Sequence, residues 1–219
     1  TKNRPLVTGV LTDREALIFA WVSGVGSVVW LGVLTNWVAA GLSLFAILFY
    51  VVVYTLLLKR RTPQNIIWGG IAGCMPVLIG WAAVTGELSW AAWVLFAVVF
   101  LWTPPHYWPL SMKYRAEYQS VGVPMLAVVR GRAAVGLQVI LYAWATVACS
   151  LLLVPVAQMG IVYALVAAGS GAWFIIESHR LYATAIRHGE VKAMRVFHSS
   201  ISYLTLVFLA VGIDPLLPF

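Results

Sequence analysis

Residues 16–58 read ALIFAWVSGVGSVVWLGVLTNWVAAGLSLFAILFYVVVYTLLL, which is 43 positions without a single Asp, Glu, Lys or Arg. A helix crosses the hydrocarbon core of a membrane with about 20 apolar residues. This stretch is therefore too long for one crossing and long enough for two. We predict two membrane-spanning helices here, joined near Thr35, Asn36 and Trp37.

The composition of the whole chain agrees with this interpretation. Of its 219 residues, 62% are hydrophobic and only 10% are charged, whereas an average soluble domain is roughly half apolar and about a quarter charged. So few charges exclude a soluble globular fold. The formal net charge of +7 does not indicate nucleic acid, because the basic residues fall in short loops between apolar runs. The expected surroundings are a lipid bilayer.

The other charge-free runs supply the remaining spans. Residues 62–86 and 88–112 are each long enough for one span. Residues 133–176 are long enough for two, with a break near 155–158, and residues 196–213 give the last. We therefore predict an all-α, polytopic bundle with seven membrane spans, forming a single integral-membrane domain over residues 1–219.

Basic residues orient these spans. With the N-terminus on one side, threading seven spans brings all 14 Lys and Arg residues to that side, and leaves only Glu87 and Asp214 on the other. Basic loops face the cytoplasm. The basic residues are Lys2, Arg4, Arg14, Lys59, Arg60, Arg61, Lys113, Arg115, Arg130, Arg132, Arg180, Arg187, Lys192 and Arg195. We expect an integral protein of a bacterial plasma membrane or an organellar inner membrane, with its site in the long cytoplasmic loops.

Three consecutive cations, Lys59, Arg60 and Arg61, stand between two predicted spans. They have two interpretations. Arg and Lys side chains at a helix end bind polyphosphates, but they also anchor a span by reaching to lipid headgroups. Asn65, at the start of the next apolar run, favours a role in the bundle because a buried amide needs a polar partner.

An aromatic run, WTPPHYW, covers residues 102–108. Pro104 and Pro105 are expected to end or kink the helix, which leaves His106 just inside the cytoplasmic interface. One interpretation is an aromatic belt with a hydrogen-bonded histidine. The other is a polar group aimed into a pocket for a flat aromatic ligand, with Trp102, Tyr107 and Trp108 as neighbouring ring faces.

Glu117 is the notable acid of the largest cytoplasmic loop. It is flanked by Lys113 and Arg115, so it is either a solvated partner of Arg115 or a ligand for Mg²⁺. This cation uses one or two carboxylates together with substrate phosphate oxygens. The sequence contains no HExxH, GxSxG or P-loop motif, so no other catalytic or metal-binding pattern competes with this loop.

Four segments resemble the haem O synthase (protohaem IX farnesyltransferase) family of UbiA-type intramembrane prenyltransferases. They read NRPL at 3–6, YTLLLKRRTPQNIIWGG at 54–70, WTPPHYW at 102–108 and GVPML at 122–126. The resemblance implies a bundle of nine transmembrane helices with two acidic motifs on the cytoplasmic side. The loop of Glu117 corresponds to the second motif, with Glu where relatives often have Asp. The first motif and two helices would precede Arg4, so we expect an N-terminally incomplete chain.

The resemblance further implies transfer of a farnesyl group from farnesyl diphosphate to a vinyl group of haem B, with Mg²⁺ as cofactor. Haem A synthase and terminal-oxidase assembly factors would be further partners. Glu117 would be the metal ligand and, with the cations Lys59, Arg60 and Lys113, would carry catalysis. Substrate-binding candidates are Arg4, Tyr54, Asn65, Trp102, His106 and Tyr107.

Three alternatives stay open. A prenyltransferase with a quinone-precursor acceptor would use the same cationic and acidic groups. A non-catalytic haem-handling protein for oxidase assembly would bind haem without turnover. A transporter or channel is disfavoured, because such proteins carry charges inside their spans and these spans have none at mid-depth.

Overall fold

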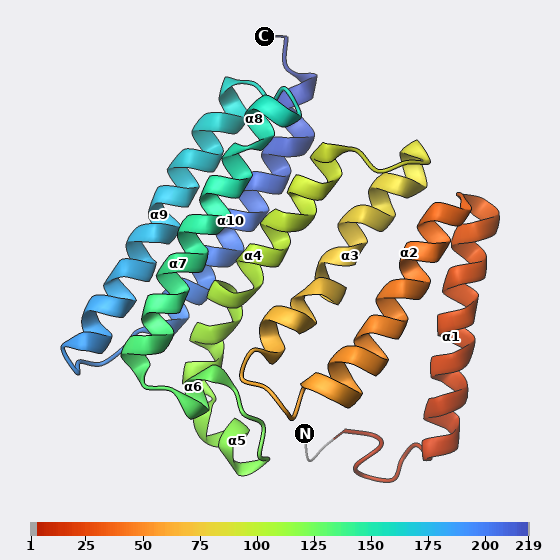
Figure 1. Cartoon of the computed structure of the whole chain (residues 1–219), viewed down its shortest axis with the longest axis horizontal. Coiled ribbons are helices and arrows are strands. Elements are labelled where there is room, and N and C mark those ends of the chain that lie inside the picture. Colours follow the sequence, from red (N-terminus) through yellow and green to blue (C-terminus); the bar gives the residue numbers. More distant parts are fainter. Residues whose placement is uncertain (1–3, 219) are drawn as a thin grey trace.

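The computed structural model describes residues 4–218, and these are helical with short connections (Figure 1). Lys2 and Asn3, used above for topology and for the opening motif, lie outside the described residues. The long helices are α1 (Asp13–Leu34), α2 (Trp37–Leu48) with its π-helical continuation η1 (Phe49–Leu58), α3 (Asn65–Thr85), α4 (Trp90–Lys113), α7 (Arg132–Leu151), α9 (Ile161–Ile186) and α10 (Ala193–Ile213). The short helices are α5 (Arg115–Ser120), α6 (Leu126–Val129), α8 (Leu153–Val156) and the 3₁₀ turn η2 (Asp214–Leu216).

The first predicted turn lies where the sequence indicated. Asn36 caps α2, since its side-chain oxygen accepts a hydrogen bond from the Ala39 backbone N–H at 2.9 Å. Its side-chain amide donates to the carbonyl of Ala82 in α3 at 2.6 Å. One polar side chain therefore satisfies an orphan helix donor and also ties the α1–α2 turn to α3.

Six helices in the described part of the chain are long and apolar enough to cross a membrane. They span Asp13–Leu34, Trp37–Leu58, Asn65–Thr85, Arg132–Val156, Ile161–Ile186 and Ala193–Leu216. The predicted span that is not among the six is residues 88–112, which corresponds to α4, a helix of 24 residues. Its sequence contains four tryptophans and three prolines, residues that reduce hydropathy although the helix is long enough to cross.

Of the two outcomes expected for Pro104 and Pro105, an end of the helix is wrong. The helix α4 continues through them, and through Pro109, to Lys113. Pro104 and Pro105 are buried, so packing on all sides holds the helix together. Each proline still lacks a backbone N–H, which leaves the carbonyl four residues earlier without its helical donor.

The helix α4 lies at the centre of the arrangement. It packs against α3 on one side and against α7 and α10 on the other, and α9 covers α7 and α10 (Figure 1). Most of the buried core belongs to this four-helix group of α4, α7, α9 and α10. At the other edge α1 contacts α2 and has no buried residue, as expected for a helix whose surroundings are lipid.

All Lys and Arg residues among residues 4–218 lie at one end of the bundle, which we call the basic end. It is the lower end in Figure 1, where α5 and α6 are drawn. Glu87 and Asp214 lie at the opposite end, because Glu87 follows α3 and Asp214 follows α10. The separation of charge predicted from the sequence therefore holds for the described residues.

Asp214 also stabilises the fold. It is buried, and its carboxylate accepts hydrogen bonds from the backbone N–H groups of Gly160 and Tyr163, at 2.5 and 2.9 Å. These are donors of the first turn of α9, which has no side-chain cap of its own. A residue at the end of α10 thus caps the start of α9.

We expect Asp214→Ala to reduce the free energy of unfolding by about 1–2 kcal/mol, the loss typical of a helix N-cap. Asp214→Asn should give an intermediate value, because an amide oxygen replaces only part of the carboxylate. Chemical denaturation in detergent measures the change. Glu87→Ala, at the same end but exposed, is the control, and equal stability of the two alanine variants would contradict this role.

Candidate functional site

His106 is held between two aromatic rings. It stacks on Trp102 of α4, with ring centroids 4.1 Å apart and planes inclined by 15°, and on Phe197 of α10, at 4.6 Å and 25°. Trp102 donates its indole N–H to the Ser200 carbonyl at 2.8 Å. The position and plane of the imidazole are therefore fixed by contacts from α4 and α10, and His106 and Ser200 are 94 positions apart in sequence.

The hydrogen bonds around Ser200 favour one tautomer of His106. Its Nδ1 lies 2.9 Å from the Ser200 hydroxyl oxygen. This hydroxyl has one hydrogen, which it donates to the carbonyl of Phe197 at 2.7 Å. With this hydrogen donated to Phe197, Ser200 accepts from a protonated Nδ1 of His106, and in the neutral ring Nε2 then keeps its lone pair. A neutral imidazole oriented through its other nitrogen is the usual form of a metal-binding histidine.

A second polar group lies between α4, α5 and η1. The hydroxyls of Tyr107 and Tyr118 are 3.1 Å apart. Burial raises the pKa of the Tyr118 phenol above its usual value, and the hydrogen bond to Tyr107 and the nearby Tyr54 and Glu117 add to the shift. Three predicted site residues, Tyr54, Tyr107 and Glu117, are thus neighbours of one tyrosine that the sequence did not single out.

Tyr54 is positioned by a close approach to α3. A Cβ added to Gly69 would lie 2.7 Å from the Tyr54 ring, so only glycine leaves room for the ring at this place. Gly69, in the glycine pair at the end of the 54–70 motif, therefore allows the close packing of Tyr54 against α3.

Asn65 sits at the start of α3, with 1% of its surface exposed. Its amide donates to the Lys59 carbonyl at 3.1 Å, which folds the cationic turn back onto α3. The side-chain oxygen of Asn65 has no hydrogen-bond partner within residues 4–218. The amide nitrogen of Asn65 thus has the polar partner that was expected, whereas its oxygen can still accept a hydrogen bond.

The remaining charged candidates are exposed. Lys59, Arg60, Lys113 and Glu117 are all solvent-accessible at the basic end, and Arg4 is exposed in the loop before α1. The interpretation of Glu117 as an ion-pair partner of Arg115 is wrong. Within residues 4–218 the one ion pair joins Arg180 to Glu177, at 2.6 Å.

Trp108 does not belong to the site. Its side chain is fully buried and packs edge-on against Tyr142 of α7, with ring centroids 5.4 Å apart. It therefore faces α7, whereas Trp102 and His106 face α10. Two consecutive aromatic residues of a helix point in directions about 100° apart, so the run 102–108 could not place all its rings in one pocket.

The carboxylate of Glu117 fits a Mg²⁺ site only if a substrate supplies further oxygen ligands. Among residues 4–218 no three His, Cys, Asp or Glu side chains lie close enough together to hold a metal ion. Glu117 provides one carboxylate near the Tyr118 phenol. Mg²⁺ accepts one or two carboxylates when phosphate oxygens and water complete its octahedron, so Glu117 fits this cation as one member of a shared ligand set.

Sequence reasoning missed Phe197, Ser200 and Tyr118. Phe197 and Ser200 orient His106, and Tyr118 pairs with Tyr107. A weak signal existed for Ser200, which belongs to a run of serines at the start of the last apolar stretch. Hydroxyl groups that enter a membrane helix need a partner within the bundle.

Comparison with known proteins places the chain among membrane prenyltransferases. The model of the UbiA prenyltransferase family matches residues 1–213. The protoheme IX farnesyltransferase of Clavibacter michiganensis subsp. michiganensis is 76% identical over 219 residues, which is 100% of this chain and 72% of that protein.

Two further relatives carry the same name. The protein of Leifsonia xyli subsp. xyli is 73% identical over 219 residues, covering 100% of this chain and 71% of its own length. The protein of Tropheryma whipplei is 58% identical over 214 residues, covering 98% of this chain and 71% of its own length. No solved structure matches the chain.

Proposed function

This chain belongs to the UbiA prenyltransferase family, and from that premise we propose that it transfers a farnesyl group from farnesyl diphosphate to a vinyl group of haem B. The observation that carries the choice of acceptor is the setting of His106. An imidazole stacked between Trp102 and Phe197 and hydrogen-bonded through Nδ1 to Ser200 suits a flat iron porphyrin better than a quinone precursor. The names of the most similar relatives support the same choice.

The proposed membrane arrangement has seven spans, because α4 crosses the membrane in addition to the six helices described above. A helix of 24 residues is about 36 Å long and exceeds the hydrocarbon core of about 30 Å. The basic end then faces the cytoplasm of a bacterial cell, according to the positive-inside rule. His106, seven residues before the end of α4, lies about 10 Å from that end along the helix axis.

The reaction begins at the allylic diphosphate. Its carbon–oxygen bond breaks when the negative charge that develops on the leaving diphosphate is neutralised. Lys59, Arg60 and Lys113 are exposed cations at the basic end, and we assign them to this role. Mg²⁺, held by Glu117 and by diphosphate oxygens, would supply further neutralisation. Arg4 and the free oxygen of Asn65 complete the set of polar groups at this end.

The second step forms the new carbon–carbon bond. The farnesyl cation arises in an apolar bundle that excludes water and other nucleophiles. We assign the aromatic rings of Trp102 and Tyr107 to the stabilisation of this cation by cation–π attraction, and Tyr54 lies near the same group of tyrosines. The vinyl group of the porphyrin, held by His106, then attacks the cation. The positive charge passes to the vinyl carbon next to the porphyrin ring, where one water molecule adds and loses a proton, so that the product carries a farnesyl and a hydroxyl group and diphosphate leaves.

Acceptor choice tests this proposal. Purified full-length protein should transfer labelled farnesyl from farnesyl diphosphate to haem B in the presence of Mg²⁺, and should leave a hydroxybenzoate-type acceptor unlabelled. Label on the hydroxybenzoate alone would favour a quinone pathway. Haem binding without any label on haem would favour a non-catalytic haem-handling protein.

A further inference from the structure

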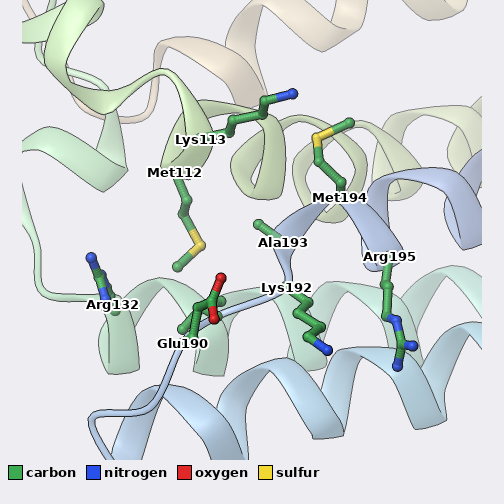
Figure 2. A pocket seen from close by; sticks show the side chains of 9 residues that line it. Met112, Lys113, Arg132, Glu190, Lys192, Ala193, Met194 and Arg195 are labelled. Carbon is green, nitrogen blue, oxygen red and sulfur yellow. The ribbon is translucent and has the colours of Figure 1, made fainter.

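A pocket of about 400 Å³ opens at the basic end between α4, α7 and the connection into α10. We call it the basic pocket (Figure 2). Lys113 lies on its α4 side, Arg132 begins α7, and Lys192 and Arg195 come from the start of α10. The volume lies in the range of small-molecule sites.

The charge of the basic pocket is not neutralised by the protein. Four cations and one carboxylate, that of Glu190, line it, which leaves three positive charges in excess. None of these five side chains forms an ion pair within 4.0 Å, because the one ion pair among residues 4–218 joins Arg180 to Glu177. Unpaired cations that share a concave surface raise the local concentration of anions.

Two helix starts add to this field. Arg132 and Ala193 are the first residues of α7 and α10, and neither helix has a side-chain cap. The backbone N–H groups of a first helical turn have no partner within the helix and carry partial positive charge. Both helices are long, at 20 and 21 residues, and both begin at the basic pocket.

The lining is also partly apolar. The thioethers of Met112 and Met194 belong to it, and Figure 2 shows the Met112 side chain between Arg132 and the α10 side. A ligand that suits this lining has an anionic group and an apolar continuation. A soluble phosphate would use only the cations.

We propose that the basic pocket binds the headgroup of an anionic phospholipid. The pocket lies where α4 ends and where α7 and α10 begin, which is the depth of lipid headgroups if these helices cross the membrane. Basic pockets between transmembrane helices on the cytoplasmic side bind anionic headgroups in this way. The lipid phosphate would contact Arg132, Lys192 and Arg195, and the glycerol and upper acyl chain would contact the methionines. The ligand would hold α4, α7 and α10 together at the end where no helix cap does so.

Lipid retention measured by native mass spectrometry tests the proposal. The full-length protein is released from nanodiscs that contain equal amounts of phosphatidylglycerol and phosphatidylcholine, and the bound lipid is identified. We expect phosphatidylglycerol to remain bound. The triple variant Arg132→Gln, Lys192→Gln, Arg195→Gln should retain it at least tenfold less well, because each cation near a lipid headgroup contributes about fivefold to binding. Glu190→Gln should increase retention.

A matched control distinguishes lipid binding in the basic pocket from attraction to the overall positive charge of the basic end. The triple variant Arg14→Gln, Arg61→Gln, Arg187→Gln removes the same charge from the same end, outside the basic pocket, and should retain phosphatidylglycerol as the unmodified protein does. Equal loss in both triple variants would overturn the proposal, as would equal retention of the two lipids. Displacement of the lipid by millimolar pyrophosphate would also overturn it, because the site would then serve a soluble anion. Circular dichroism of each variant verifies folding. Farnesyl transfer is not measured, so the outcome does not depend on the proposed function.

Discussion

Glu117→Ala is expected to reduce farnesyl transfer by about 10²–10³-fold, and Lys59→Ala by a similar factor, while both variants insert into the membrane normally. This factor is typical for the loss of one group that stabilises developing charge in a transition state. Glu117→Ala would remove a ligand of the metal ion that neutralises the diphosphate. Lys59→Ala would remove a cation that contacts the diphosphate directly. Both side chains are exposed, so neither substitution leaves a cavity or an unpaired buried group.

The measurement is the turnover number for farnesylated haem at saturating substrate. Glu87→Ala and Arg187→Ala are the matched controls, since both remove an exposed charge away from the candidate site and should retain full activity. Lys59→Arg should recover part of the activity, because a cation is restored with a different geometry. Normal turnover in both Glu117→Ala and Lys59→Ala would show that the diphosphate is bound elsewhere.

His106→Ala is expected to abolish haem binding that is measurable at micromolar concentration, and Ser200→Ala to weaken it about tenfold. Loss of a hydrogen-bond partner that orients a metal-binding histidine typically costs 10- to 100-fold in affinity. The Ser200 hydroxyl is the hydrogen-bond partner of His106 Nδ1. Ser200→Ala therefore leaves the ring between Trp102 and Phe197 but removes the partner that favours one tautomer.

Titration of the protein with haem B, followed in the Soret band, measures both effects. Ser199→Ala is the control. Ser199 is buried on the same helix and donates to the Val196 carbonyl at 3.0 Å, so its loss should leave the haem affinity and the Soret maximum unchanged. A shifted Soret maximum in Ser200→Ala together with weaker binding is the signature of altered iron ligation. Equal affinities in Ser199→Ala and Ser200→Ala would remove Ser200 from the site.

Much of the fold could be predicted because a membrane imposes one-dimensional constraints. The length of a span and the absence of charge within it are properties of continuous segments. The turn at Asn36 and the separation of the basic residues from Asp214 could therefore be predicted from the sequence. Pro104 and Pro105 show the limit of such local rules. Burial between α3, α7 and α10 keeps α4 helical through them, and the sequence around the prolines does not contain that information.

The candidate site could be predicted only as a list of separate residues. His106 was singled out by its position in an aromatic run, but its orientation depends on Phe197 and Ser200, about 90 residues further along the chain. The basic pocket was missed for the same reason. Arg132 and Lys192 were each explained by topology, and nothing in the local sequence indicated that they line one cavity.

Conversion of haem B is the most direct test of the account. The purified full-length protein, incubated with haem B, farnesyl diphosphate and Mg²⁺, should yield a haem that elutes later in reversed-phase chromatography and whose mass shows one added farnesyl group and one added hydroxyl group. The yield should follow the amount of enzyme and should disappear when farnesyl diphosphate is left out. Unchanged haem B from a folded, membrane-inserted preparation that binds both substrates would contradict the proposed function.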